Sequence, residues 1–184
     1  MSAYVAILRG INVSGHKIIK MERLRAGFEA LGFAHVKTYV QSGNVIFETD
    51  EPPAGLAAKI EGKILDEFGF EVPVLTKSAK ELKDIVKRNP FVKDDQIDQA
   101  KLHVTFLSSD PPRNALESLQ PLAVGAEQVR LAGRAVYLFC PNGYGTTKLT
   151  NTALEKKLSC RATTRNWATT NKLLEMATNP VRLP

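Results

Sequence analysis

Apolar and polar positions along the first half of the chain follow two periods, one typical of strands and one typical of helices. Segments rich in β-branched and aromatic side chains predict strands at residues 4–9, 36–41, 44–48 and 72–76. Apolar residues spaced three or four apart predict helices at 21–31 and 56–68, each followed by a glycine. The resulting order, strand–helix–strand–strand–helix–strand, is that of a ferredoxin-like sandwich.

The second half repeats this order less regularly. Its predicted elements are a strand, a short helix, two strands joined by a Gly-centred turn, a helix and a last strand, at residues 102–107, 114–119, 127–139, 152–158 and 160–164. Thr152 and Glu155 have the spacing of a capping box, which places the start of the helix at Thr152. The sequence therefore predicts an α+β protein made of two ferredoxin-like (βαββαβ) subdomains with antiparallel sheets.

The junction between the halves also has a clear pattern. Ser78 and Glu81 form a second capping-box spacing and predict a helix that Pro90 stops, and residues 92–98 are a polar linker. A final helix is predicted near residues 168–177. The predicted domains are therefore a first subdomain, a connecting helix with its linker, and a second subdomain with the C-terminal helix, at residues 1–77, 78–100 and 101–184.

Charge is distributed unevenly along the 184 residues, which carry a net charge of +6. Residues 1–47 hold six Lys/Arg and two Asp/Glu, residues 48–127 hold ten against fifteen, and residues 128–174 hold eight against one. Two basic regions beside an acidic middle indicate an anionic partner or solvated basic faces.

Compartment and membrane association follow from what the composition lacks. No apolar run approaches the length of a membrane span, and the N-terminus does not have the pattern of a signal peptide. Cys140 and Cys160 have no motif spacing, so no disulfide framework is predicted. We expect a cytoplasmic protein that does not interact with membranes.

The stretch ILRGINVSGHK at residues 7–17 has glycines in a spacing that invites comparison with a phosphate-binding Walker loop. In that loop the lysine follows the second glycine directly and a hydroxyl residue comes next. Here His16 separates Gly15 from Lys17, and Ile18 occupies the hydroxyl position, so a nucleotide triphosphatase is not predicted. Two interpretations remain open: a turn that directs backbone N–H groups at an anion between Arg9 and Lys17, or a turn with solvated cations.

Other polar loops have similar chemistry. The hairpin YVQSGNVIF presents neutral amides, the loop 141–151 is rich in Gly and Thr, and the segment 160–172 contains many hydrogen-bond donors at the start of the last helix. The candidate ligand-binding residues are Arg9, Asn12, Lys17, Gln41, Asn44, Lys148, Arg165 and Asn166. The alternative is structural: Asn and Ser side chains stabilise turns, and Asn166 caps the helix.

The residue types missing from these loops exclude several kinds of chemistry. They contain no Asp or Glu, so neither a two-carboxylate hydrolase nor a carboxylate Mg²⁺ site is predicted. The histidines are His16, His35 and His103, and none has metal-ligand spacing. We predict no metal and no cofactor. The strand 44–48 lacks the basic and aromatic pattern of an RNA-binding sheet, which leaves nucleic acid weakly supported.

Several of these motifs together carry a family resemblance. LRGINVSGHK, QSGNVIF, NGYGTTKLTN and ATTRNW occur in this order over nearly the whole chain. The sequence thus resembles the uncharacterised bacterial family called domain of unknown function 1697 (DUF1697). The resemblance implies a pair of ferredoxin-like subdomains and no particular activity. The family often has Gly-Gly where this chain has Ser14-Gly15.

The leading hypothesis is a cytoplasmic binding protein for a small anionic or phosphorylated ligand, with nucleic acid as a weaker form of it. A second hypothesis is an enzyme that stabilises a developing negative charge with cations and no metal, with His16 as acid or base. A third is a structural or oligomerisation module. The sequence decides neither the oligomeric state nor whether the protein is an enzyme.

Overall fold

The computed structural model describes residues 1–179, and these residues form two compact units. The first unit is Met1–Leu82 together with the chain from Lys172 onward, and the second is Lys83–Asn171. The domain boundaries predicted after residues 77 and 100 stay a prediction. Each unit is described by itself below.

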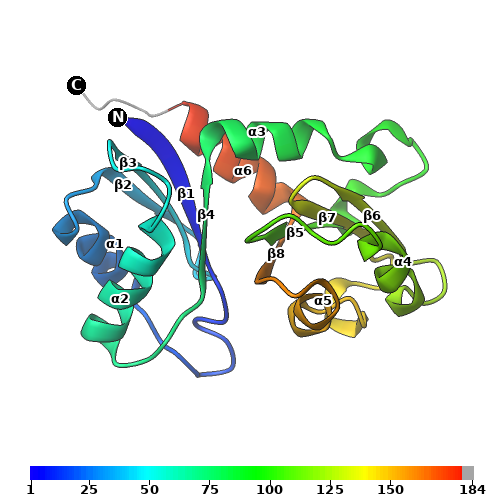
Figure 1. Ribbon diagram of the computed structural model, residues 1–184, viewed down its shortest axis with the longest axis horizontal. Coiled ribbons are helices and arrows are strands. Elements are labelled where there is room, and N and C mark those ends of the chain that lie inside the picture. Colours follow the sequence, from blue (N-terminus) through cyan, green and yellow to red (C-terminus); the bar gives the residue numbers. More distant parts are fainter. Residues whose placement is uncertain (180–184) are drawn as a thin grey trace. The chain divides into compact units, whose positions relative to one another are not determined.

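The first unit contains a four-stranded antiparallel sheet with strand order β2-β3-β1-β4. Its elements are β1 (Ser2–Leu8), α1 (Met21–Ala30), β2 (Ala34–Tyr39), β3 (Asn44–Thr49), α2 (Leu56–Phe68) and β4 (Val74–Ser78), shown in blue to green in Figure 1. This is the predicted order of elements, and the ferredoxin-like fold of the first half is confirmed.

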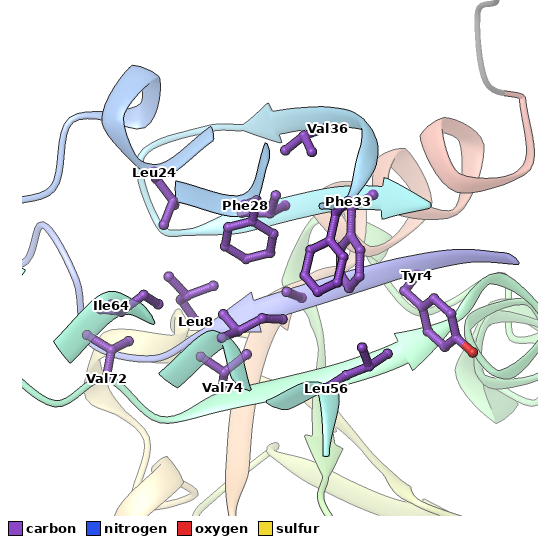
Figure 2. Close-up of a cluster of buried hydrophobic side chains, with 14 of the residues drawn as sticks. Tyr4, Leu8, Leu24, Phe28, Phe33, Val36, Leu56, Ile64, Val72 and Val74 are labelled. Atoms are coloured by element: carbon purple, nitrogen blue, oxygen red, sulfur yellow. The ribbon is translucent and has the colours of Figure 1, made fainter. Parts of the chain in front are cut away.

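The core of the first unit lies between the sheet and its two helices (Figure 2). Leu56, Ile60 and Ile64 of the predicted apolar stripe of α2 are buried there, whereas Phe68 at its end is partly buried. Leu24 and Phe28 of α1 are also buried. Phe47 of β3 lies at the centre of an aromatic cluster, with ring centroids 4.5 Å from Phe33 and 5.5 Å from Phe28. Aromatic pairs at these distances add to the stabilisation that burial provides.

The second unit repeats the topology, because its sheet has the order β6-β7-β5-β8. Its elements are β5 (Leu102–Leu107), α4 (Ala115–Leu119), β6 (Gln128–Ala132), β7 (Ala135–Phe139), α5 (Asn151–Leu158) and β8 (Ala162–Asn166) (Figure 1). The predicted last strand exists, although it begins and ends two residues later than 160–164. The prediction of two ferredoxin-like subdomains is therefore confirmed.

Two further helices pass from one unit to the other along the chain. α3 (Ala79–Lys87) begins in the first unit, and α6 (Trp167–Thr178) begins in the second unit and ends in the first. In the first unit, Met176 and Ala177 of α6 line a recess together with Ala3 of β1 and Ile46 of β3. The end of the described chain therefore packs against the face of the first sheet that α1 and α2 do not cover.

Both units use a helix carboxylate to fix the start of their last strand. The backbone N–H of Val74, the first residue of β4, donates to Glu61 of α2 at 2.9 Å. In the same way, Ala162 of β8 donates to Glu155 of α5 at 2.9 Å. The duplication thus extends to an individual side-chain contact between the second helix and the fourth strand of each unit.

The helix caps confirm one predicted capping box and contradict the other. The Ser78 N–H donates to the Glu81 carboxylate at 2.8 Å, and the Glu81 N–H donates to the Ser78 hydroxyl at 3.2 Å, as predicted. The box expected at Thr152 is wrong, because Thr150 caps α5 by accepting from the N–H of Ala153. Glu155 is instead bound to the start of β8.

Gly43 in the β2–β3 turn is required by both conformation and space. Its φ of 84° is in the left-handed region, and an added Cβ would lie 2.7 Å from Ile11 Cδ1 and 2.8 Å from Leu8 Cβ. We expect Gly43→Ala to lower the free energy of unfolding by about 2–4 kcal/mol, since backbone strain and a steric clash combine.

Gly15→Ala is the matched control for this substitution. Gly15 has a φ of 76° but open space around its Cβ position, so the strain acts alone and a loss of about 1 kcal/mol is expected. Urea unfolding of the two variants measures the difference. Equal losses of stability would show that the clash of the added Cβ with Ile11 and Leu8 does not contribute to the cost of Gly43→Ala.

Tyr137 of β7 is the largest fully buried side chain and makes a buried polar contact in the second unit. Its hydroxyl donates to the Ile85 carbonyl oxygen at 2.7 Å. Burial raises the pKa of Tyr137 to about 12, against a smaller opposing effect of the Arg88 charge. The folded state therefore holds this proton at pH values where the unfolded chain releases it.

Tyr137 should make stability fall with pH in the alkaline range. Because the folded pKa lies above the unfolded one, its contribution is complete below pH 10 and is lost by pH 12, which corresponds to roughly 2–3 kcal/mol. We expect Tyr137→Phe to be about 1–3 kcal/mol less stable at pH 7, where the Ile85 carbonyl loses its donor. The deficit should shrink between pH 10 and 11 in urea unfolding, and a constant deficit would contradict this assignment.

Candidate functional site

Three loops meet at one end of the first sheet, where β1 ends, β2 turns into β3 and β4 begins. The Leu8 N–H donates to the Gly43 carbonyl in the β2–β3 turn at 2.8 Å, and the Arg9 N–H donates to the Pro73 carbonyl at 3.0 Å. The chain after β1 is thereby fixed to both neighbouring loops. This end of the sheet carries all the candidate residues that the sequence predicts in the first half.

The Asn12 side chain binds this loop to the hairpin. Its Oδ1 accepts from the Ile19 N–H at 2.8 Å, and its Nδ2 donates to the carbonyls of Ile19 at 3.0 Å and Gln41 at 2.8 Å. Both amide hydrogens are thus used inside the protein. In this geometry Asn12 positions the other candidate residues.

The segment between Asn12 and Lys17 forms a small hairpin. The Asn12 N–H donates to the Lys17 carbonyl at 3.1 Å, and the His16 N–H donates to the Val13 carbonyl at 2.9 Å. Ser14 and the glycine after it have φ values of 49° and 76°, the pair of positive angles that a type I′ turn requires. A hairpin turn explains the Ser14-Gly15 pair, and α1 starts only at residue 21.

The remaining candidates of the first half differ in exposure. Lys17 is exposed, and its Nζ donates to the Glu71 carbonyl at 2.6 Å. Arg9 is half-buried and Gln41 is exposed. Asn44 is fully buried, and its Nδ2 donates to the Tyr39 carbonyl and to the Ser42 hydroxyl, so it stabilises the hairpin.

The candidates of the second half lie around α5 and β8. Lys148 is exposed in the loop before α5. Asn166 Oδ1 accepts from the Thr169 N–H at 2.7 Å, which is the geometry of a helix cap for α6. Arg165 is half-buried and its Nη1 donates to the Thr164 carbonyl at 2.9 Å. Burial lowers the pKa of Arg165 to about 10, which still leaves the guanidinium charged at neutral pH.

A cluster of hydroxyl groups near these residues was not predicted. Thr164 Oγ1 lies 2.7 Å from both Asn151 Oδ1 and Thr105 Oγ1, and 3.2 Å from Tyr144 Oη. Because a carbonyl-type oxygen only accepts, Thr164 donates to Asn151 and accepts from the two other hydroxyls. The signal was the recurrence of Thr, Tyr and Asn in the motifs at 142–151 and 162–167.

His103 completes this cluster. Its ring stacks on Tyr144, with centroids 5.0 Å apart and planes inclined by 26°. Burial lowers the pKa of His103, against a smaller opposing effect of the Lys101 backbone, so the imidazole is neutral at pH 7. Among the described residues, its buried Nδ1 has no hydrogen-bond partner of good geometry.

The polar groups of the two units lie at opposite ends of the repeated fold. The Asn12 loop follows the end of β1, whereas His103 pairs with Asn166 at the beginning of β5, which is the strand equivalent to β1. The two groups are therefore not copies of one duplicated site. That they act together on one ligand stays a prediction.

The two cysteines are far apart in the second unit. The N–H of Cys140 donates to the Lys101 carbonyl before β5, while the neighbour of Cys160, Arg161, accepts from the Ser108 N–H after β5. An extended strand of this length spans roughly 20 Å, beyond the reach of a disulfide. Burial also raises the pKa of the Cys140 thiol to about 11, so this thiol is protonated at neutral pH.

Residues 1–179 contain neither a metal-ligand cluster nor a membrane-spanning helix. Within this range, no three His, Cys, Asp or Glu side chains come together in a way that could hold a metal ion. None of the described helices combines the length and the apolar character that crossing a membrane requires.

Asn12 provides a test of the loop geometry. We expect Asn12→Ala to lower the free energy of unfolding by about 2–3 kcal/mol, because two carbonyls and one N–H lose their partner. Gln41→Ala is the control, since Gln41 contributes its backbone carbonyl to this network, and its cost should stay within about 0.5 kcal/mol. Chemical unfolding measures both, and equal stabilities of the two variants would contradict the role of Asn12.

Comparison with known proteins identifies a family and a similar fold but no activity. A family model described as Protein of unknown function (DUF1697) matches residues 1–137, so the motifs at 142–151 and 162–167 lie beyond the matched range. No curated protein matches the sequence. The structure of a conserved bacterial protein from Streptococcus pneumoniae is similar over 96% of this chain and 98% of that chain, with a TM-score of 0.77 and 22% identity. This likeness concerns the fold.

Proposed function

The chain belongs to the DUF1697 family, whose description assigns no activity, and we propose from its geometry that it is a cytoplasmic binding protein for a small anionic or phosphorylated ligand. The observation that carries the proposal is the convergence of Arg9, Lys17 and Gln41 at one end of the first sheet. We call this set, with His16 and Lys20, the basic rim.

The chemistry of the basic rim supports an anion. The segments 9–20 and 37–47, which carry all five residues of the basic rim, contain no Asp or Glu. Lys17 uses one ammonium N–H for the Glu71 carbonyl, and an ammonium group has three donors. The hydrogen bonds of Asn12 hold this cation on a loop that is fixed to the hairpin, so little ordering is needed on binding.

The second unit offers a separate set of donors. Lys148 is exposed, whereas Arg165 is half-buried and Asn166 uses its Oδ1 to cap α6. We propose the basic rim as the primary site because Lys17 lies on a loop that is hydrogen-bonded to the neighbouring loops.

Thermal unfolding with inorganic phosphate, a mononucleotide and a single-stranded oligonucleotide at low and high salt tests this function. A phosphorylated ligand that binds the folded state raises the melting temperature. We expect Lys17→Gln to weaken binding by roughly tenfold, the effect of losing one charge-assisted hydrogen bond.

Lys80→Gln is the control of equal charge change. Lys80 is exposed at the start of α3, beyond Ser78, which pairs with Tyr4 at the other end of the sheet. Equal effects of the two substitutions, or no stabilisation by any phosphate compound, would rule out a site at the basic rim. An increase in melting temperature that occurs with the oligonucleotide alone and falls steeply as salt is raised would indicate that the ligand is a nucleic acid.

A further inference from the structure

Three of the exposed large aliphatic residues are sequence neighbours of residues in the Asn12 hydrogen-bond network. Val13, Ile18 and Val40 are 57%, 58% and 48% exposed. Single exposed aliphatic residues are common, but a group of them at one place marks a binding surface.

The hydrogen bonds of Asn12 bring together the backbone segments that carry these three residues. Val13 directly follows Asn12, and Ile18 lies between two residues whose backbones are bonded to Asn12. Val40 directly precedes Gln41, whose carbonyl accepts from Asn12 Nδ2. Each aliphatic residue is thus one position away from an atom bound to Asn12, or from Asn12 itself. We call these three residues the aliphatic patch.

Val40 occupies its position against its own conformational preference. Its φ of 51° lies in the left-handed region, which is an outlier for a β-branched residue and which Gly or Asn adopts more easily. Nearly half of the side chain is exposed, so burial does not explain the choice of valine.

The aliphatic patch and the basic rim interleave along the chain. Lys17 immediately precedes Ile18, and Lys20 follows two residues later, both exposed. Resting on the proposed function, we propose that the ligand is an amphipathic phosphate ester, with its phosphate at Lys17 and Lys20 and its aliphatic chain on Val13, Ile18 and Val40.

Two other anionic partners fit this surface less well. Nucleobases stack on aromatic rings, and the patch consists of aliphatic side chains without a π face. A bilayer needs more buried apolar area than three half-exposed side chains offer, since even one myristoyl chain gives marginal binding. A free small amphiphile matches both the size and the charge.

Binding of a homologous series by isothermal titration calorimetry tests the proposal: inorganic phosphate, butyl phosphate and octyl phosphate, each below its micellar concentration. We expect the affinity to rise roughly twofold per added methylene up to about four carbons and then level off, because the patch covers one side of the chain. The variant Val13→Thr/Ile18→Thr/Val40→Thr should lose this gain and still bind inorganic phosphate as the wild type does.

Val124→Thr is the matched control, because Val124 is 53% exposed in the second unit, and it should leave the whole series unchanged. Phosphate binding without dependence on chain length would overturn the amphipathic ligand and leave the proposed function intact. Absence of binding by all three compounds would overturn both. Tighter binding to vesicles of anionic phospholipid than to octyl phosphate would replace the free amphiphile by a membrane surface.

Discussion

The last strand of each unit pairs with the first strand, on the edge away from the hairpin. A helix carboxylate fixes the residue at which this last strand begins. Glu61 and Glu155 each accept the first N–H of that strand, β4 in one unit and β8 in the other. In the first unit, the contact of Glu61 fixes the start of β4, and the loop just before β4 carries Glu71 and Pro73. Those two carbonyls in turn hold Lys17 and Arg9, so the geometry of the basic rim depends on it.

Much of the fold follows from periodicity, whereas the use of each polar side chain does not. The four-residue spacing of Leu56, Ile60 and Ile64 predicts α2, because a helix is the conformation that puts all three side chains on one buried face. Asn12 and Asn44 are different. Their donors bind carbonyls that the hairpin brings close, one of them 29 residues away in the chain, and local patterns carry no information about such partners.

The same limit applied to helix caps and to the hydroxyl cluster. The local pattern favours Thr152, because Glu155 stands three residues later. Glu155 instead accepts the first N–H of β8, and Thr150 caps the helix. Tyr144 and Thr164 belong to separate motifs whose contact depends on the pairing of β5 with β8. Several polar residues of the quoted motifs thus hold loops in place through hydrogen bonds within the protein.

The return of α6 to the first unit has a consequence for biosynthesis. Met176 and Ala177 complete a surface that begins with Ala3, yet the ribosome makes them after the whole second unit. At typical elongation rates this interval lasts roughly 5–20 s. During translation the strands of the first sheet are therefore complete well before the helix end that packs against one of its faces has been synthesised.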